Sequence, residues 1–387
     1  MCSGAGPPID VFFKVFRGEP PVSGAFPRRG RRKYYLPIGT YSPSTFMWRL
    51  SARVVTAFSV EFVIHLAFFT FVSWLLGSYL ELGPWGMLAN GAFFAAIFII
   101  VEWLIGPSLA SSLFRPRWIE RADDPVLWSM VHEEAARAGV KVRRIGVVGS
   151  EAPNALAYAS ITGRRYLVFT RGLLLEMTFP EVRAVACYLL GCAKSGGLPT
   201  LTTLSGLLTI PHGIAGGYIG ARLGGRRPGY GSAVAAGIGY VLHALTYPQT
   251  VMVARVMSLL GDEFSIQHTG DPSSFVSALM KSVVGCALRP LDPMRARCAP
   301  LKGLMFQDPT TALREAAAMR ESAERRGIAL SRLVDMEGVS LPEEDRLALH
   351  AFEKFWPQAG PVGRLEHAIE LGKSVRSPIK VGLSWIE

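Results

Sequence analysis

Two long apolar runs near the start of the chain constrain its architecture more than any other feature. Residues 54–77 form a 24-residue run whose only ionisable side chains are Glu61 and His65, and residues 86–109 form a second run of the same length. At about 1.5 Å per residue, each run can cross a hydrocarbon core of ~30 Å. The connecting residues 78–85 contain no Lys or Arg. The pattern predicts a transmembrane hairpin with both ends on the same side.

The charge distribution orients this hairpin. Residues 1–53 carry nine Lys and Arg residues against two Asp and Glu residues, and basic residues resume after the second run at Arg115 and Arg117. Basic residues flank membrane spans mainly on the cytoplasmic side. We therefore expect a multi-pass protein of the cell membrane, with a cytoplasmic tail and soluble domain and the lipid bilayer as a partner. No module that interleaves aromatic and basic side chains follows, so we expect no nucleic-acid partner.

The composition agrees with a membrane protein. Hydrophobic residues make up 50% of the chain and charged residues only 18%, whereas soluble domains carry about a quarter charged residues. Within the first run, Glu61 and His65 are four residues apart and share one helix face. An ionisable pair inside a membrane run marks a candidate functional site. The alternative is an ordinary contact within a helix bundle, or a Glu61 that reaches the lipid headgroups.

A second pair of apolar runs predicts a second membrane hairpin. These runs cover residues 198–220 and 229–253. The loop between them, residues 221–228, contains three arginines, which contradicts the positive-inside rule for an external loop. Pro211 interrupts the first of the two runs, so a shallow or broken entry into the membrane is the alternative to a full crossing.

The segments outside the runs have the patterns of a soluble domain. Apolar residues at helical spacing predict helices over residues 125–139 and 180–193. Short stretches rich in β-branched residues predict strands over residues 142–148 and 166–170, with a further strand and turn over residues 157–163. The chain beyond the second hairpin is predicted to be mostly helical.

Residues 145–194 carry an ordered set of motifs. A predicted strand is followed by Pro-Asn-Ala-x-Ala, a hairpin, Thr-x-Gly-Leu-Leu and a helix that begins Glu-Val-x-Ala-Val. This order resembles the HtpX family of membrane zinc metalloproteases, and the two apolar runs on each side resemble that family too. The matching residues are Pro153, Asn154, Ala155, Ala157, Thr170, Gly172, Leu173, Leu174, Glu181, Val182, Ala184, Val185, Leu190 and Gly191.

The metal motif of the family is degenerate in this chain. In the family's His-Glu-x-x-His helix, the two His lie one turn apart and bind Zn²⁺, and the Glu takes a proton from the metal-bound water. The resemblance places Tyr188 and Cys192 at the His positions and Leu189 at the general-base position. The third ligand, a Glu on a later helix, corresponds to Ser258, four residues before the matching Asp262.

These replacements predict a pseudoprotease without a cofactor. Phenol, thiol and hydroxyl groups must each lose a proton to bind zinc, and Leu189 cannot accept one. Losing a general base alone costs roughly 10²–10⁴ in rate. The family's groove beside an edge strand, which pairs with extended substrates, is implied here at Asn154, Tyr158, Ala159 and Ser160. We expect this groove to bind membrane-protein or unfolded segments, or the protein to regulate an active protease paralogue.

Two alternatives remain open. One is an active membrane metalloendopeptidase in membrane-protein quality control, with zinc at an unorthodox site built from Cys192 and the distant His268. The sequence His132-Glu133-Glu134 begins like the metal motif, but its fifth residue is Ala136, and we interpret it as part of an ordinary amphipathic helix. The other alternative is a structural membrane anchor whose basic tail recruits partners.

Together these patterns predict an α+β membrane protein with four hydrophobic helices in two hairpins and a mostly helical, metalloprotease-like cytoplasmic domain that carries a small β-sheet. The predicted divisions are a basic cytoplasmic tail (1–53), a first transmembrane hairpin (54–110), the first part of the metalloprotease-like core (111–197), a second membrane hairpin (198–253) and a helical second part of that domain (254–387).

Overall fold

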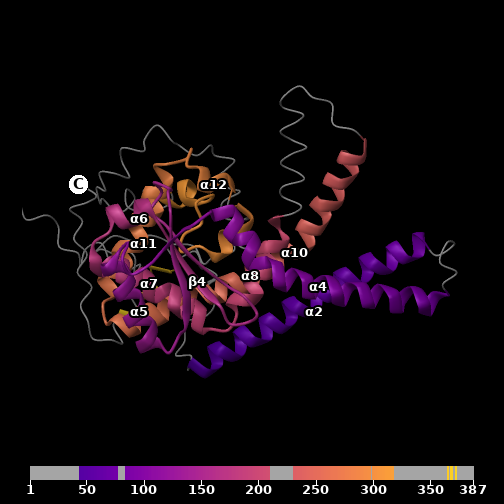
Figure 1. The fold of residues 1–387 in the computed structure, drawn as a ribbon, viewed down its shortest axis with the longest axis horizontal. Coiled ribbons are helices and arrows are strands. Elements are labelled where there is room, and N and C mark those ends of the chain that lie inside the picture. Colours follow the sequence, from indigo (N-terminus) through magenta and orange to yellow (C-terminus); the bar gives the residue numbers. More distant parts are fainter. Residues whose placement is uncertain are drawn as a thin grey trace, which may run out of the picture.

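The structure, a computed structural model of the chain, describes residues 43–76, 83–209, 230–297, 299–317, 364–365, 367–368 and 371–372. A long helical hairpin projects from a body of helices packed around one sheet (Figure 1). Most of the predicted basic tail and most of the predicted C-terminal helices lie outside the described residues.

The projecting hairpin consists of α2 (Pro43–Leu75) and α4 (Pro84–Phe114). Residues Leu50–Leu75 and all of α4 are long and apolar enough to cross a membrane, as the first hairpin prediction requires. The two helices approach closely where Gly91 meets Thr70, because a Cβ atom on Gly91 would lie 2.8 Å from the Thr70 backbone nitrogen. Only glycine fits at that crossing.

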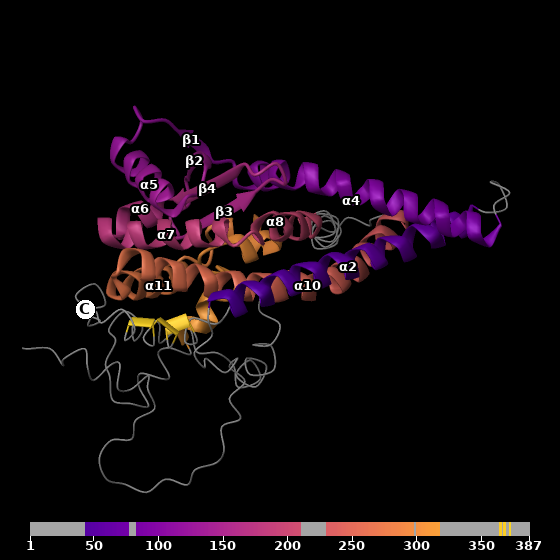
Figure 2. The same cartoon turned by 90° about the horizontal axis from the view of Figure 1, so that it is seen from below.

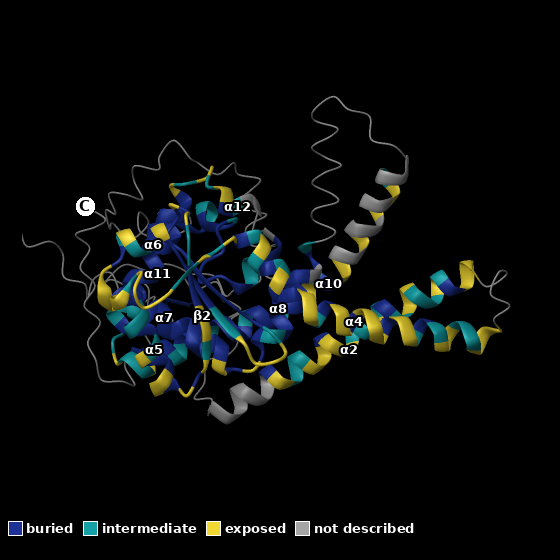
Figure 3. Ribbon diagram, viewed as in Figure 1, coloured by how far each residue is buried: buried dark blue, intermediate teal, exposed yellow. Residues whose placement is uncertain are grey.

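The outer surface of the hairpin is apolar. Val63, Phe71 and Trp74 on α2 and Phe93 and Leu104 on α4 are each at least 55% exposed, and exposed residues follow the whole hairpin in Figure 3. Contiguous exposed apolar surface of this kind is unfavourable in water and is matched by hydrocarbon. The described hairpin therefore fits association with a membrane.

One four-stranded sheet lies in the body, in the order β1-β2-β4-β3. β2 and β4 pair in parallel, and the two outer pairings are antiparallel. The strands predicted over residues 142–148 and 166–170 are confirmed as β2 and β4. The bounds of the four strands are Arg117–Ile119, Val142–Val148, Ala155–Ala159 and Arg165–Thr170, in chain order from β1 to β4.

Helices cover the sheet in layers. In Figure 2 the sheet and α5 (Pro125–Ala138) form one side, α7 (Phe179–Lys194) lies in the middle, and α10 (Tyr230–Thr269) and α11 (Pro272–Ala287) form the layer beyond it. The short α6 (Arg171–Glu176) connects β4 to α7. Because α7 is enclosed by sheet and helices, every residue of its second half up to Ala193 is buried.

The structure corrects the prediction of four membrane helices. Within the described residues, only α2 and α4 are long and apolar enough to span. The third run contributes α8 (Leu198–Leu207), a ten-residue helix whose side chains are almost all buried in the body. An apolar segment of this length is typical of a core helix. The fourth run is the first part of α10, which has 40 residues in total, and the later part of α10 packs against α7 in the body. Residues 210–229 lie outside the described residues.

The chain after α11 returns to the sheet. It forms α12 (Pro293–Arg297) and the 3₁₀ helix η1 (Ala299–Leu304). Met305 then forms an antiparallel bridge with Leu156 of β3, and the Phe306 N–H donates to the Ala155 carbonyl at 2.7 Å. This contact covers the outer edge of β3.

Candidate active site

Helix α7 carries three of the four degenerate motif positions. Its start is fixed by a capping box, in which Thr178 and Glu181 satisfy each other's backbone N–H groups. Gly191 and, on α10, Gly261 let the two helices approach closely. A Cβ atom on Gly261 would lie 2.7 Å from the Tyr188 ring and 2.8 Å from the Cys192 sulfur, so these two side chains fill the contact between α7 and α10.

The structure brings the four predicted positions into one buried region. Tyr188, Leu189, Cys192 and Ser258 are each at most 5% exposed. The Cys192 thiol donates to the Met257 carbonyl at 3.6 Å, which puts it against the turn of α10 that holds Ser258. The Ser258 hydroxyl donates to the Arg255 carbonyl at 3.0 Å. Cys192 therefore lies beside the turn of α10 that holds Ser258, and the assignment of these residues to the family's ligand positions stays a prediction.

A buried ion pair occupies the same region. The Arg364 guanidinium donates to both carboxylate oxygens of Asp262, with its Nη2 at 2.6 Å and its Nε at 2.9 Å. Its Nη1 donates to the Phe306 carbonyl at 2.6 Å, and its centre lies 4.9 Å from the Tyr188 ring centroid. Both side chains of the pair are at most 1% exposed. Sequence reasoning used Asp262 only as a marker of the alignment and missed Arg364 altogether.

The charge states of these groups do not suit a metal ion. Burial raises the pKa of the Cys192 thiol to about 12 and the pKa of the Tyr188 phenol well above its usual value. Burial opposes the charge of Arg364, but the Asp262 carboxylate raises the pKa of the guanidinium. At neutral pH the thiol and phenol are therefore protonated, and Asp262 is committed to Arg364. These residues do not fit a bound zinc ion.

The predicted groove residues lie in the edge strand β3 or directly beside its ends. All five residues of β3, Tyr158 and Ala159 included, are buried. The Ala159 N–H donates to Thr202 of α8 at 3.0 Å, and the Tyr158 hydroxyl lies 2.8 Å from the Ser111 hydroxyl. Ser160 is half-buried beside the turn. Pairing of a client with this edge stays a prediction, and it requires the Met305 segment to move.

Asn154 holds the Met305 segment on the edge. Its side-chain amide donates to the Gln307 carbonyl at 2.6 Å, and its carbonyl oxygen accepts from the Gln307 N–H at 3.1 Å. The Gln307 side chain in turn bonds to Glu315, which also accepts from the Thr311 hydroxyl at 3.1 Å. Burial, followed by the neighbouring charge of Asp308, raises the pKa of Glu315 to about 8.

We expect Glu315→Gln to flatten the pH dependence of stability. A carboxyl with a raised pKa stabilises the fold fully below its ordinary pKa and loses that contribution as the pH rises to about 8. At 1.36 kcal/mol per pKa unit, the wild type should lose roughly 2–5 kcal/mol between pH 5 and pH 9. Chemical denaturation at both pH values measures this loss, and an equal loss in the variant would contradict the assignment.

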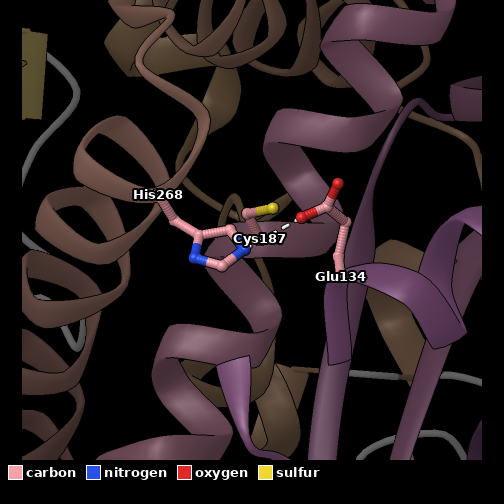
Figure 4. Close-up of side chains that lie close together, drawn as sticks. All are labelled: Glu134, Cys187 and His268. Atoms are coloured by element: carbon pink, nitrogen blue, oxygen red, sulfur yellow. Dashed lines mark hydrogen bonds and ion pairs between the residues drawn. The ribbon is translucent and has the colours of Figure 1, made fainter. Parts of the chain in front are cut away.

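A second cluster includes Cys187, the residue that precedes Tyr188 on α7. The Glu134, Cys187 and His268 side chains, from α5, α7 and α10, offer ligand atoms that all lie within 4.8 Å of one another (Figure 4). The alternative prediction paired His268 with Cys192, but His268 Nε2 lies 2.9 Å from Glu134 Oε2. The other Glu134 oxygen accepts from Arg137 at 2.9 Å and from Arg183 at 2.7 Å.

The electrostatics of this second cluster favour an ion-pair network. Burial opposes ionisation of Glu134, yet the bonds from Arg183 and the other partners hold its pKa below the usual range. Burial raises the pKa of the Cys187 thiol to about 12. His132 stacks on Trp128 within α5, with 3.7 Å between the two ring centroids. This contact agrees with the interpretation of residues 132–136 as part of an ordinary helix.

The predicted membrane pair gains a third member. Glu61 and His65 lie on α2 as predicted, and Glu102 of α4 lies against His65 with 3.2 Å between Oε1 and Nε2. All three are at most 8% exposed. The sequence shows Glu102 as the ionisable residue of the second run, but only the packing of α2 on α4 brings it to the pair.

Comparison with known proteins agrees with the resemblance. The sequence model of peptidase family M48 matches residues 121–333, more than half of the chain. The chain is 26% identical to a "Protease HtpX homolog" of Aeropyrum pernix over 241 residues, 60% of this chain and 75% of that protein. It is 26% identical to one of Methanothermobacter thermautotrophicus over 240 residues, 61% of this chain and 87% of that protein. No solved structure matches.

Proposed function

The chain belongs to peptidase family M48 as an HtpX-like member, and we propose that it no longer hydrolyses peptide bonds and acts by binding polypeptides. The clients we propose are membrane-protein or unfolded segments, or an active protease paralogue that the protein regulates. The replaced donor positions on α7 and the predicted groove beside β3 are two separate supports for this proposal.

The observation that carries the proposal is the content of the site between α7 and α10. Where the family places metal ligands and a general base, this chain has the protonated side chains of Tyr188 and Cys192 and the apolar Leu189. Both carboxylate oxygens of Asp262 accept hydrogen bonds from Arg364. Without an activated water or a proton acceptor, hydrolysis loses its chemical step.

The membrane setting follows from the described hairpin. We propose that α2 and α4 cross the cell membrane and that the body and the basic tail lie in the cytoplasm. The exposed apolar surface of the hairpin supports the crossing, and the basic residues on both flanks, from the tail to Arg115 and Arg117, support the orientation.

The proposed binding surface is the outer edge of β3. An extended client would add a strand there, and backbone hydrogen bonds would supply affinity without demanding one sequence. The Met305–Phe306 segment now makes that contact within the chain. This segment forms a single bridge rather than a full ladder, and we propose that a client strand displaces it together with the bond from the Ala159 N–H to Thr202.

A reversible lock tests the binding surface. We expect fluorescein-labelled casein to bind the detergent-purified full chain and to stay intact. In the double variant Leu156→Cys with Met305→Cys, the paired residues of the bridge lie within disulfide range. Oxidation should weaken casein binding by at least roughly tenfold, because a 1.4 kcal/mol loss already gives that factor, and reduction should restore it. Fluorescence anisotropy measures both states.

A disulfide at the opposite edge provides the matched control. Arg117 and Val147 pair between β1 and β2, and the same double cysteine substitution there should leave casein binding unchanged in either redox state. Equal binding by the locked and unlocked edge would place the clients elsewhere. Absence of binding to the wild type would contradict the binding function itself.

The second candidate function is an active metallopeptidase, and the Glu134–Cys187–His268 cluster is the observation that favours it. It predicts that casein is cut, that a chelator stops the cutting, and that Cys187→Ala does the same. Gel electrophoresis of the casein used above separates the two functions, because the proposed pseudoprotease leaves casein uncut in every sample.

A further inference from the structure

Three buried side chains meet inside the membrane hairpin. His65 Nε2 lies 3.2 Å from Glu102 Oε1, and His65 Nδ1 lies 3.4 Å from Glu61 Oε1. One ligand atom from each side chain lies within 4.8 Å of the others. Glu61 is twelve residues into the apolar stretch Leu50–Leu75, roughly 16 Å from its start. The triad therefore lies near the middle of a ~30 Å hydrocarbon core.

The hydrogen bonding of His65 favours one tautomer of the neutral ring. His65 Nδ1 lies 2.9 Å from the backbone carbonyl of Glu61. A carbonyl oxygen only accepts, so Nδ1 carries a proton that is directed at it. In the neutral ring, Nε2 then presents its lone pair to an oxygen of Glu102. Two lone pairs at 3.2 Å repel each other unless a positive species lies between them.

Some carboxylate oxygens of Glu61 and Glu102 remain available to bind a cation. Both oxygens of Glu61 and Oε2 of Glu102 are buried and have no hydrogen-bond partner in the part of the chain that the structure describes. Their surroundings are apolar, with the Phe98 ring centroid 5.2 Å from that of His65 and the Phe69 centroid 6.4 Å away. Buried, unpaired carboxylate oxygens are strongly unfavourable in such a setting unless a cation or proton neutralises them.

We propose that Glu61, His65 and Glu102 bind a divalent transition-metal ion of the zinc type. Two carboxylates balance the two positive charges, so the complex is neutral within the hydrocarbon. The mixed nitrogen and oxygen donors suit zinc and its neighbours rather than Mg²⁺ or Ca²⁺, which take oxygen ligands. The Glu61 carbonyl that holds Nδ1 orients the ring for a metal at Nε2, as outer partners of histidine ligands do.

This site differs in charge from the cluster in the body. Glu134 already bonds to Arg137 and Arg183, whose positive charges oppose an incoming cation. The triad in the hairpin has no ion pair to Lys or Arg among the described residues. A metal bound between α2 and α4 would connect these two helices without contacting the body. The outcome of the metal test is therefore independent of the outcome of the casein assay.

The test uses the full chain in detergent, stripped with a chelator and titrated with Zn²⁺. We expect one bound zinc per chain after desalting, measured by elemental analysis, and a higher melting temperature with zinc than without it. Glu61→Gln, His65→Gln and Glu102→Gln should each weaken binding by at least roughly tenfold and remove the zinc-dependent shift. The two Glu→Gln variants remove charge without changing shape, so they should fold in the absence of metal.

Two control variants locate the ion. Asn90→Ala removes another polar contact of the same hairpin, the 3.0 Å bond to Ser73, and should keep the zinc. Cys187→Ala should keep it too. Replacement of zinc by Co²⁺ should give a visible spectrum without the thiolate charge-transfer band that a Cys187 or Cys192 ligand would add.

Several results would overturn the proposal. They are a wild type that takes up no zinc, zinc that persists in all three triad variants, and a cobalt spectrum with a thiolate band. In the first case the positive species at the triad is a proton. In the other two cases the zinc is bound by residues of the body. The casein assay would then decide whether the protein has lost its catalytic activity.

Discussion

Substitution of Asp262 by Asn should lower the free energy of unfolding by about 3–5 kcal/mol, the loss typical of a buried ion pair that keeps one charged partner. The Arg364 guanidinium would stay at about 1% exposure with no anion to balance it. It also links helix α10 to the Phe306 carbonyl, so its displacement would loosen the cover of β3. Chemical denaturation in mild detergent, followed by tryptophan fluorescence, measures the change.

Two further variants separate charge from packing. Arg171→Gln breaks an ion pair whose side chains are 63% and 56% exposed, and it should change stability by less than about 1 kcal/mol. The double variant Asp262→Leu with Arg364→Met removes both buried charges together and should recover much of the loss. A change of under ~1 kcal/mol for Asp262→Asn would mean that the pair is not buried as described.

Restoring the family's metal donors should return zinc to the body. The variant combines Tyr188→His, Leu189→Glu, Cys192→His and Ser258→Glu. The first and third side chains already pack against Gly261 of α10, one turn beyond Ser258, and His at i and i+4 on α7 would share one face. We expect one zinc per chain in addition to any zinc held by the wild type, measured by elemental analysis.

The three-substitution variant that keeps Ser258 is the matched control. It lacks the carboxylate ligand and should bind the added zinc at least roughly tenfold more weakly, since a single lost ligand costs well over 1.4 kcal/mol. If the four-substitution variant folds but takes up no additional zinc, then Ser258 is not the third ligand position. Chelator-sensitive casein cleavage by this variant alone would support loss of catalysis through these four residues.

Much of the fold could be predicted from local patterns. The strand over residues 142–148 and the helix over residues 180–193 are confirmed to within one residue at each end. The apolar run over residues 54–77 overlaps the apolar stretch Leu50–Leu75 of α2. Their signals are local: the length of the apolar run, the content of β-branched residues, and apolar residues at helical spacing. Apolar content alone could not separate membrane from core, so the run that begins at Leu198 was assigned to the membrane although α8 is buried in the body.

The sequence by itself determined the family, and it predicts the position of the degenerate motif and the loss of its donors, because these depend on residue types at fixed spacings. The tertiary structure alone decided which distant groups meet. It paired Arg364 with Asp262, brought Glu102 to His65, and set His268 beside Glu134. Such contacts depend on how closely two helices approach and at which turn, which glycines such as Gly261 permit and which no local pattern encodes.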